Sequence, residues 1–351
     1  MRFYRAFVFC LSIIAVTVSC QRTPSPVRSE PYTIREVFQT QRHEKDNVDS
    51  PSVWHGPNTH WLISTAKSTD VLIVNDASTG AFIKRVGETG SELGQFKRPN
   101  GIFVIDDYVF VVERDNRRVQ VLALPDFNPV GILGDSLLIK PYGLFVYKQN
   151  GANYALYVTD NYETENEKIP PDSALGNRIV NFSLTIEDDR IDWKLVRRFG
   201  ATEGPGVLRI VESICGDPTY NKILISEEDE SQSSVKVYDL DGGFTGIVFG
   251  LGVFHYQVEG IALYQRNTNE GYWIVTDQSY EDNRFHVFER KNFKYWGSFK
   301  GSNTANTDGI WLTQSSFGPF QSGAFYAVHD DGNVSAFDFT VIADSLSLSL
   351  K

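Results

Sequence analysis

The sequence predicts an all-β fold, a six-bladed β-propeller, on three observations. Short runs rich in Val, Ile, Phe and Tyr alternate with turns rich in Gly, Asn, Asp and Pro, as in chains built from short strands. No long stretch repeats its apolar residues with the period of an amphipathic helix. A phrase made of a polar residue, a glycine and an apolar residue recurs at intervals typical of propeller blades.

The recurring phrase defines the blades. It occurs as Asn100-Gly101-Ile102, Tyr142-Gly143-Leu144, Glu259-Gly260-Ile261 and Asp308-Gly309-Ile310, with weaker copies at Asp49-Ser50-Pro51 and Glu212-Ser213-Ile214. The copies lie about 40–50 residues apart, which is room for four strands each, except where an insertion near residues 163–173 lengthens the interval. A β-sandwich or two small β-domains would not repeat a phrase at this spacing, so we favour six blades.

Individual strands follow from runs of branched and aromatic residues between turn residues. We expect strands at residues 61–66, 71–75, 108–113, 119–124, 154–159, 222–226, 235–240, 272–276, 285–289 and 324–328. The strand-like stretch 32–38 precedes the first blade. We expect it to pair with the last blade near residues 334–339, which would close the ring and cover exposed strand edges.

Composition limits the classes of function. The 351 residues include 33 Lys and Arg against 44 Asp and Glu, which gives a formal net charge of −11. With 41% hydrophobic residues the chain can bury a sizeable core, and this excludes disorder of the whole chain. The acidic balance argues against a nucleic-acid partner, and an anionic substrate would need metal ions or a local basic patch.

Residues 1–19 are typical of a signal peptide. Arg2 and Arg5 precede an apolar run over residues 6–18 that is short for a membrane span. The run ends in Thr17-Val18-Ser19-Cys20, which resembles a bacterial lipoprotein box and predicts a lipid on Cys20, with plain export as the alternative. We therefore expect an exported lipoprotein in the outer membrane or periplasm of a Gram-negative bacterium, in contact with the membrane through its lipid alone.

The mature chain divides into a tether and one domain. Residues 20–31, with Pro24 and Pro26, predict the tether, and residues 32–351 predict the propeller. Cys10 leaves with the signal peptide and Cys20 carries the lipid, so that Cys215 remains alone. Without a disulfide or a cysteine cluster for zinc, stability must come from core packing and strand pairing.

Blade geometry predicts where chemistry would occur. The first strand of each blade lines the channel and the second runs antiparallel to it, so that the start of strand one and the end of strand two share one mouth. The strand-one starts are Asp49, Asn100, Tyr142, Glu212, Glu259 and Asp308. The strand-two ends are Lys67, Arg114, Asp160, Glu227-Glu228-Asp229, Asp277-Gln278 and His329-Asp330-Asp331.

A ring of carboxylates at one aperture would repel itself unless hard cations lie among the oxygens. Calcium takes about six to eight oxygen ligands from such groups, and Lys67 and Arg114 beside it would make a phosphate-binding arrangement. The alternative for each acid is a turn residue that caps a backbone N–H. The histidines show no metal-ligand spacing, and the sequence contains no nucleophile elbow and no glycine loop that cradles phosphate.

Together these motifs resemble the β-propeller phytases. The segment Val48-Asp49-Ser50-Pro51-Ser52-Val53-Trp54 looks like that family's Asp-Asp-Pro-Ala-Ile-Trp opening. Further similar segments follow in order: Pro141-Tyr142-Gly143-Leu144, Ser226-Glu227-Glu228-Asp229-Glu230, Val258-Glu259-Gly260-Ile261, Gln278 with Phe288-Glu289-Arg290, and Thr307-Asp308-Gly309-Ile310. The resemblance runs from about residue 46 to residue 331.

This resemblance implies an exported, calcium-dependent phosphoric monoester hydrolase of the 3-phytase type. Its substrate would be phytate or another phosphorylated small molecule, attacked by a metal-activated water without a phosphoenzyme. Carried over to this chain, the metal ligands would be Asp49, Glu212, Glu227, Glu228, Glu259, Gln278 and Asp308. Glu212, Glu259 and Asp308 would be catalytic, Lys67 and Arg114 would bind phosphate, and the protein would be a monomer.

The chain departs from the family pattern at several positions. Ser50, Gln257 and Trp311 stand where carboxylates are expected, and Asn161 stands where a lysine is expected. Each lost carboxylate weakens a calcium site, and each lost cation weakens phosphate binding. These departures are compatible with fewer ions, with a different substrate or with a loss of catalysis.

A second resemblance overlaps blade two. Residues 94–102 and 112–121 look like an NHL repeat, a blade type that mostly binds partners. In that interpretation Asn116 and Arg117 form a turn, and Arg114 pairs with Glu113 or Asp115. The alternative function is therefore a non-catalytic propeller that binds a ligand or a protein at the cell surface. A calcium-dependent lactonase is a third option.

Overall fold

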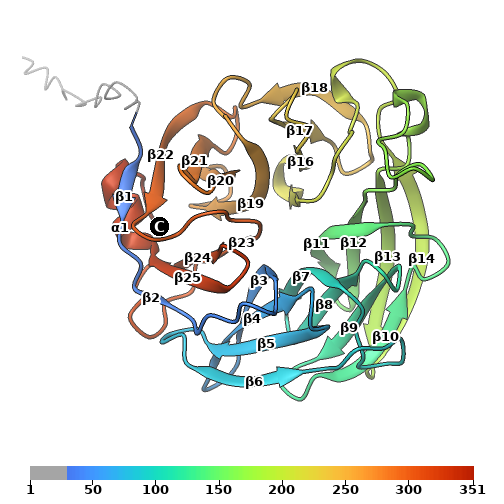
Figure 1. The fold of residues 1–351 in the computed structure, drawn as a ribbon, viewed down its shortest axis with the longest axis horizontal. Helices are drawn as coiled ribbons and strands as arrows, with labels where there is room; N and C mark the ends of the chain where they lie inside the picture. Colours follow the sequence, from blue (N-terminus) through green and yellow to red (C-terminus); the bar gives the residue numbers. More distant parts are fainter. Residues whose placement is uncertain (1–29) are drawn as a thin grey trace, which may run out of the picture.

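The fold is a ring of six blades. The computed structural model describes residues 30–351, so that the predicted signal peptide, Cys20 and most of the predicted tether lie outside the described residues. Within this range six sheets surround a central axis, and each sheet presents its first strand to the channel (Figure 1). The prediction of an all-β, six-bladed propeller is confirmed.

The sheets follow one another along the chain. Blade one contains β3 (Val48–His55), β4 (His60–Ala66), β5 (Val71–Asp76) and β6 (Phe82–Val86). Blade two contains β7 (Pro99–Ile105), β8 (Tyr108–Glu113), β9 (Arg118–Ala123) and β10 (Asn128–Leu133). Blade three contains β11 (Pro141–Asn150), β12 (Asn153–Asp160), β13 (Ile179–Glu187) and β14 (Arg190–Phe199).

The second half of the ring repeats this order. Blade four contains β15 (Ile214–Asp217), β16 (Lys222–Glu227), β17 (Ser234–Tyr238) and β18 (Phe244–Phe249). Blade five contains β19 (Gln257–Gln265), β20 (Gly271–Gln278), β21 (Arg284–Glu289) and β22 (Tyr295–Gly301). Blade six contains β23 (Ile310–Thr313), β24 (Ala324–His329) and β25 (Asn333–Asp338). The ten expected strands match strands of the structure to within about two residues at each end.

The N-terminal segment closes the ring, but over two blades. β2 (Phe38–Gln39) pairs antiparallel with β25 and becomes the fourth strand of blade six. β1 (Tyr32–Ile34) instead pairs parallel with β22 of blade five. The expectation that the whole stretch 32–38 pairs with the last blade is thus wrong for residues 32–34. The physical reason is that this stretch covers the outer edges of two neighbouring blades, which would otherwise remain unpaired.

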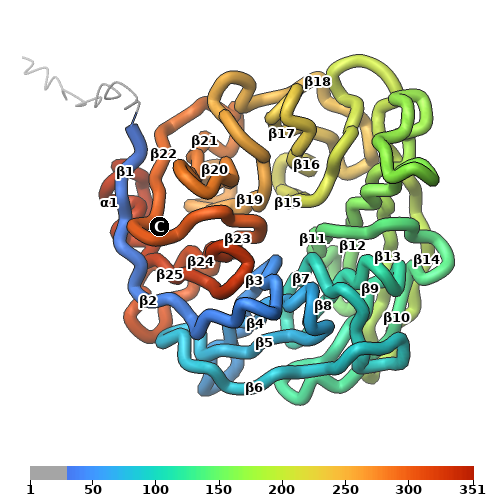
Figure 2. The backbone as a smooth tube through the Cα atoms, viewed as in Figure 1, coloured from blue at the N-terminus to red at the C-terminus, as the bar shows by residue number. Residues whose placement is uncertain are grey.

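One α-helix was not expected from the sequence. The helix α1 (Phe339–Leu346) follows β25 and lies beside β1 and β22 (Figure 2). Its apolar side chains Phe339, Ile342, Ala343 and Leu346 are buried, and the Asp338 carboxylate accepts the Thr340 N–H at its start. Two turns are too short for the helical period to stand out in the sequence. No helix in residues 30–351 has the length and the apolar character needed to cross a membrane.

The hydrophobic core lies between neighbouring blades. In residues 30–351 the buried side chains form six clusters, one at each blade interface. On β8, Val109 and Val111 pack against blade one, whereas Phe110 and Val112 pack against blade three. Since successive side chains point to opposite faces of a sheet, a strand buried on both faces must be apolar throughout. This explains the continuous apolar runs in the sequence.

The recurring glycine marks where the first strands of neighbouring blades meet. A Cβ atom on Gly101 would lie 2.6 Å from the backbone oxygen of Tyr142, and one on Gly309 would lie 2.5 Å from that of Asp49. The Gly309 N–H donates to the same Asp49 oxygen at 2.9 Å. Strand pairing is irregular at this point in blades one, two, three and five. The residue before Gly101, Gly143 and Gly260 therefore lies in a bulge at the mouth of the channel.

Replacing Gly101 by alanine should destabilise the ring. The new Cβ would press on the backbone of blade three, which cannot move away as a flexible side chain could. We expect Gly101→Ala to lower the free energy of unfolding by roughly 2 kcal/mol in urea denaturation. Gly176→Ala is the control, because its Cβ would meet a threonine methyl group at 3.2 Å. Equal stability of the two variants would contradict this account of the repeat.

Candidate metal centre

The residues at the strand-one starts come together at one mouth of the channel. Lys67 Nζ lies 2.7 Å from Asp49 Oδ1 of its own blade and 3.4 Å from Asp308 Oδ2 of blade six. The Tyr142 hydroxyl of blade three lies 3.4 Å from Asp49 Oδ1 and hydrogen-bonds Glu212 of blade four. These contacts join four blades at a single point, so the convergence expected from the repeat occurs in the structure.

Lys67 neutralises one half of this acidic ring. Its side chain is 9% exposed and lies between two carboxylates. Burial by itself lowers the pKa of Lys67, but the charges of Asp49 and Asp308 outweigh it and raise the pKa. Asp331 hydrogen-bonds Asp308 on the same side, and the Gln278 amide also donates to Asp308. Lys67 thus holds the ring together and does not line the basic cavity described below.

The other half of the ring has three carboxylates, and none of them forms an ion pair with a cation in residues 30–351. Glu212 and Glu228 of blade four and Glu259 of blade five each offer an oxygen atom, and these atoms lie within 4.8 Å of one another. Glu228 and Glu259 are buried, at 3% and 6% exposure. Glu228 Oε1 is buried and has no hydrogen-bond partner. A buried carboxylate oxygen without a partner is costly, so this cluster is suited to a cation.

The raised pKa values of these acids show the same cost of burying neighbouring negative charges. Burial and the charge of Asp49 raise the pKa of Glu212 to about 7, although the Tyr142 hydrogen bond opposes the shift. Burial and the charge of Glu212 raise the pKa values of Glu228 and Glu259 well above their usual range. Burial also raises the pKa of Asp308 to about 8, against the charge of Lys67. The acids cannot all be ionised at neutral pH unless positive charge joins them.

The donor set fits a hard cation such as calcium. The cluster offers carboxylate oxygens only, with an amide on Gln278 nearby, and no sulfur or imidazole ligand. Oxygen-only sets of this kind suit calcium and not zinc or copper. Asn100, at the same repeat position in blade two, is fully buried, and neither polar atom of its side chain has a hydrogen-bond partner. Its amide oxygen is a further potential ligand.

Glu227, which was predicted as a metal ligand, is placed elsewhere. Its carboxylate accepts the backbone N–H groups of Arg209 and Ile210 at 2.8 and 2.9 Å and pairs with Lys236 Nζ at 2.8 Å. Both oxygens are therefore already bonded within blade four. The next residue, Glu228, faces the carboxylate cluster instead. The two neighbours separate because successive residues of a strand point to opposite sides.

The same position recurs in other blades as a structural carboxylate. Glu113 accepts the Lys97 N–H, Asp160 accepts the Ile139 and Lys140 N–H groups, and Asp277 accepts the His255 and Tyr256 N–H groups. Each fixes the segment that leads into strand one of its own blade. The turn-capping interpretation that the sequence left open thus holds for Asp160, Glu227 and Asp277.

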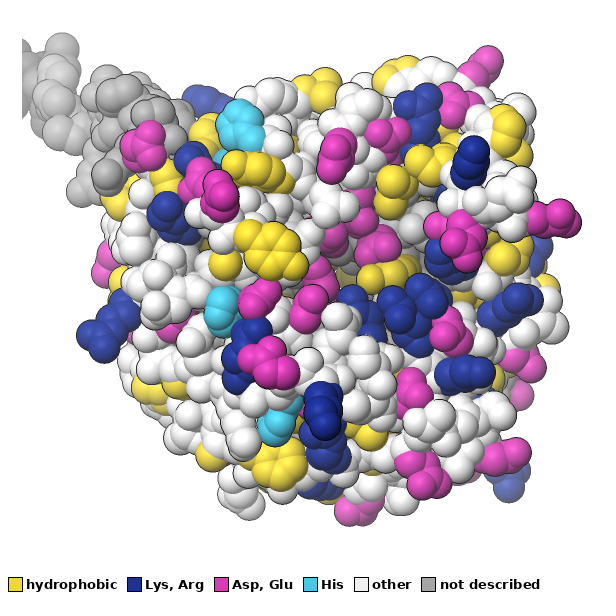
Figure 3. Space-filling view, viewed as in Figure 1, with side chains coloured by type: hydrophobic (Ala, Val, Ile, Leu, Met, Phe, Trp, Pro, Cys, Tyr) yellow, Lys and Arg dark blue, Asp and Glu magenta, His cyan; other side chains and the backbone are white. Residues whose placement is uncertain are grey.

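A basic cavity adjoins the carboxylate cluster. It has a volume of about 370 Å³, and its lining includes Arg98, Arg114, Lys140, Tyr142, Asn161, Glu212, Glu228 and Gln257. Figure 3 shows Lys and Arg side chains gathered beside the acidic centre of this face. Arg98 Nε is buried and has no hydrogen-bond partner. A fourth cationic residue of the lining, Arg178, already donates to the backbone oxygens of Leu208, Asp160 and Tyr162. An anion in the cavity would therefore meet Arg98, Arg114 and Lys140 on one side and the carboxylate cluster on the other.

Arg114 takes part in this cavity and also in a local ion pair. Its Nε lies 2.8 Å from Asp115 Oδ1, and its side chain remains 25% exposed. Asn116 and Arg117 lie in the turn between β8 and β9, and Arg117 has a φ of 55°. The pairing and the turn that the NHL-like interpretation expected both occur in the structure.

The sequence analysis did not propose Arg98 or Lys140 for the site. Arg98 and Lys140 occupy the same repeat position, directly before the prolines that open blades two and three. This shared basic-proline pattern was a usable signal. Asp331 belongs to the predicted strand-two end of blade six, and it reaches Asp308 where Asp330 and Asp331 both have a positive φ, 46° and 53°. Such a backbone cannot be read from the sequence.

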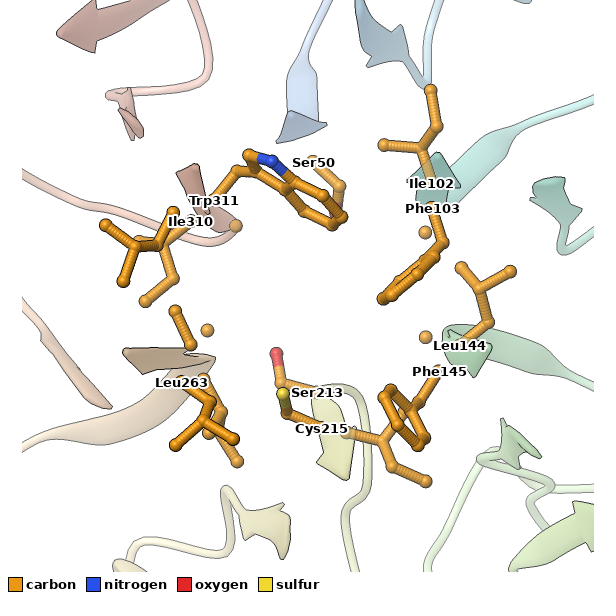
Figure 4. Close-up of a pocket in the computed structure, with 18 of the residues that line it drawn as sticks. Ser50, Ile102, Phe103, Leu144, Phe145, Ser213, Cys215, Leu263, Ile310 and Trp311 are labelled. Atoms are coloured by element: carbon orange, nitrogen blue, oxygen red, sulfur yellow. The ribbon is translucent and has the colours of Figure 1, made fainter. Parts of the chain in front are cut away.

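Below the mouth, the channel is mostly apolar. Its cavity of about 300 Å³ is lined by the first strands of the blades. Figure 4 shows that Phe103, Phe145, Leu263 and Trp311 project toward the axis from different blades, with Cys215 among them. Trp311 stands where the family resemblance expects a carboxylate, and its ring packs edge-on against Phe103 at 5.1 Å. The cavity also has the polar side chains of Ser50, Ser213, Gln265 and Gln314 in its lining, but no charged side chain.

Comparison with known proteins places the chain in a family. The family model described as Phytase matches residues 97–340, which span blades two to six, whereas Asp49 and Lys67 of blade one lie outside the match. No curated protein matches the chain. The match covers more than half of the sequence and agrees with the six-bladed ring. The chain belongs to the β-propeller phytase family.

Proposed function

We propose that this protein is a calcium-dependent phosphomonoesterase that acts on phytate or a related phosphate ester. The observation that carries the proposal is the contact between two features of one mouth. A cluster of three carboxylates lies beside a cavity whose lining includes Arg98, Arg114 and Lys140, and Glu212 and Glu228 belong to both. Family membership supports phosphatase chemistry of the phytase type, and calcium dependence is the finer part of the proposal.

The residues of the chain divide the work of such a reaction. Glu212, Glu228 and Glu259 would hold calcium, which when bound supplies positive charge and makes a water molecule a better nucleophile. Arg98, Arg114 and Lys140 would bind the phosphate oxygens through charge-assisted hydrogen bonds and hold the phosphorus atom over the cluster. The Tyr142 hydroxyl, which hydrogen-bonds Glu212, fixes that carboxylate toward the cavity. Asp49 and Asp308, which pair with Lys67, would supply further oxygen ligands from their side of the ring.

A non-catalytic binding protein is the second candidate. The observation that favours it is that both predicted phosphate-binding residues already form ion pairs within the chain. Lys67 is paired with Asp49 and Asp308. Arg114 is paired with Asp115. Asn161 lines the cavity where the family resemblance expects a lysine. The same pocket could then hold an anionic ligand without turnover.

The cellular setting is part of the proposal. We infer export with cleavage after residue 19, a lipid on Cys20, and a monomer held at the outer membrane or in the periplasm. The support is the N-terminal sequence, with its short apolar run before Cys20. The mass of the N-terminal peptide of the exported protein distinguishes a lipid-modified Cys20 from plain cleavage.

The activity itself can be tested on the chain that begins after Cys20. We expect phosphate release from phytate with calcium and none after chelation. Glu212→Gln and Glu259→Gln should each lower the rate by about 100-fold or more, because each removes a carboxylate from the centre. Calcium binding without release from any of a panel of phosphomonoesters would contradict the enzyme proposal and favour the binding protein.

Glu228 and Glu227 form a matched pair for the metal centre. Glu228→Gln should weaken calcium binding at least about tenfold in calorimetric titration, with little loss of stability, because it removes a charge from the cluster. Glu227→Gln should lower stability by about 3 kcal/mol, because it leaves the Lys236 ammonium buried without its partner. Folded Glu227→Gln protein should bind calcium like the unmodified protein.

The opposite result would assign the site differently. If Glu227→Gln abolished calcium binding while Glu228→Gln left it unchanged, the centre would not be the cluster of Glu212, Glu228 and Glu259. Urea denaturation of both variants separates a loss of metal affinity from a loss of fold.

A further inference from the structure

The loop after β12 is unusually long for its position. In blade two the corresponding connection between β8 and β9 is residues 114–117, whereas in blade three the connection between β12 and β13 is residues 161–178. This is the insertion that interrupts the sequence repeat. It includes the short 3₁₀ helix η1 (Asp172–Ala174) and is rich in acidic residues.

The loop is fastened beside the basic cavity. Near its start, Glu163 Oε2 lies 2.6 Å from Lys140 Nζ. Near its end, Asp172 Oδ2 lies 3.0 Å from Arg209 Nη2. The two ends of the loop also contact each other, because the Tyr162 ring packs on the Arg178 guanidinium at 4.5 Å and the Tyr162 hydroxyl donates to the Ala174 oxygen at 2.7 Å. These contacts hold the loop in one position.

The loop brings negative charge to the cavity that would bind the substrate. Glu163, Glu167 and Ile169 line the cavity together with Arg98, Arg114 and Lys140. Glu163 contacts Lys140 directly, so that this cation, like Arg114 with Asp115, already has an anionic partner supplied by the chain itself. Both side chains remain about 30% exposed, at 29% for Lys140 and 30% for Glu163, so that a solute can reach the pair.

We propose that Glu163 is a specificity-determining residue that competes with anionic ligands for Lys140. An incoming anion can contact Lys140 only if it displaces the Glu163 carboxylate. A ligand with one weakly charged group has little to offset that displacement, whereas a ligand with several phosphate groups can contact Arg98 and Arg114 at the same time. The contact therefore favours multiply phosphorylated ligands. The inference rests on the anion-binding role given to the cavity in the proposed function.

The size of the effect follows from the type of ion pair. Pairs between partly exposed side chains contribute up to about 1 kcal/mol, which corresponds to about a fivefold change in an equilibrium constant. Release of Lys140 should therefore tighten anion binding by about two- to fivefold. The effect should be largest at low ionic strength, where charges at a surface are least screened.

Pyrophosphate binding to the chain that begins after Cys20, measured by calorimetry in metal-free buffer of low ionic strength, tests the proposal. Glu163→Gln should lower the dissociation constant about two- to fivefold. Glu165→Gln is the matched control, because it removes the same charge from an exposed position of the same loop that does not line the cavity. Its dissociation constant should stay close to that of the unmodified protein.

Lys140→Gln completes a double-mutant cycle. It should weaken pyrophosphate binding, and in its background Glu163→Gln should have no further effect, because the cation over which they compete is gone. Equal effects of Glu163→Gln and Glu165→Gln would overturn the proposal. So would tightening by Glu163→Gln in the Lys140→Gln background, or a lack of pyrophosphate binding in every variant.

This test separates the inference from the proposed function. Phosphate release from phytate with no special effect of Glu163→Gln on pyrophosphate binding would leave the phosphatase in place and remove the role of Glu163. The expected cycle without release from any phosphomonoester would keep the competition and remove the phosphatase.

Discussion

The burial of several carboxylates around one axis is the constraint on which the rest of this structure depends. Each blade delivers the residue at the start of its first strand to the same aperture, and four of those six residues are acids. In the half formed by blades one and six, Lys67 balances Asp49 and Asp308. In the half formed by blades four and five, the described residues place no cation within the cluster of Glu212, Glu228 and Glu259.

This unequal charge balance gives the mouth an acidic side and a basic side. The unbalanced acids lie at the edge of the basic cavity, whose cations come from blades two and three. Positive charge is therefore needed on one side and already present on the other. The calcium ion and phosphate ester of the proposed function would meet both requirements, since the metal would join the acids and the phosphate oxygens would meet the arginines and the lysine. Fixed charges of this kind cost no reorganisation during a reaction.

Two kinds of acid lie at the same mouth, and in blade four they are neighbours in the sequence. Glu227 and its equivalents Asp160 and Asp277 accept backbone N–H groups and hold the entering segments in place. Glu228, one residue later, faces the cluster. The acids that accept N–H groups therefore hold in place the mouth at which Glu212, Glu228 and Glu259 lie. The insertion in blade three adds a third kind, Glu163, which lies on a loop and forms an ion pair with Lys140.

The ring could be predicted from the sequence, because four short strands in each blade and a close approach of neighbouring first strands produce a repeated phrase at regular spacing. The sequence also determined that Asp49, Glu212, Glu259 and Asp308 share one mouth, since equivalent positions of a repeat occupy equivalent places in a propeller. It could not decide between Glu227 and Glu228, which are identical in type and adjacent, because strand register sets which one faces the axis. The tertiary structure alone paired Lys67 with two acids, gathered Arg98 and Lys140 beside Glu212, and turned Asp331 toward Asp308. These are contacts between separate blades or depend on a left-handed backbone, and a linear sequence records neither.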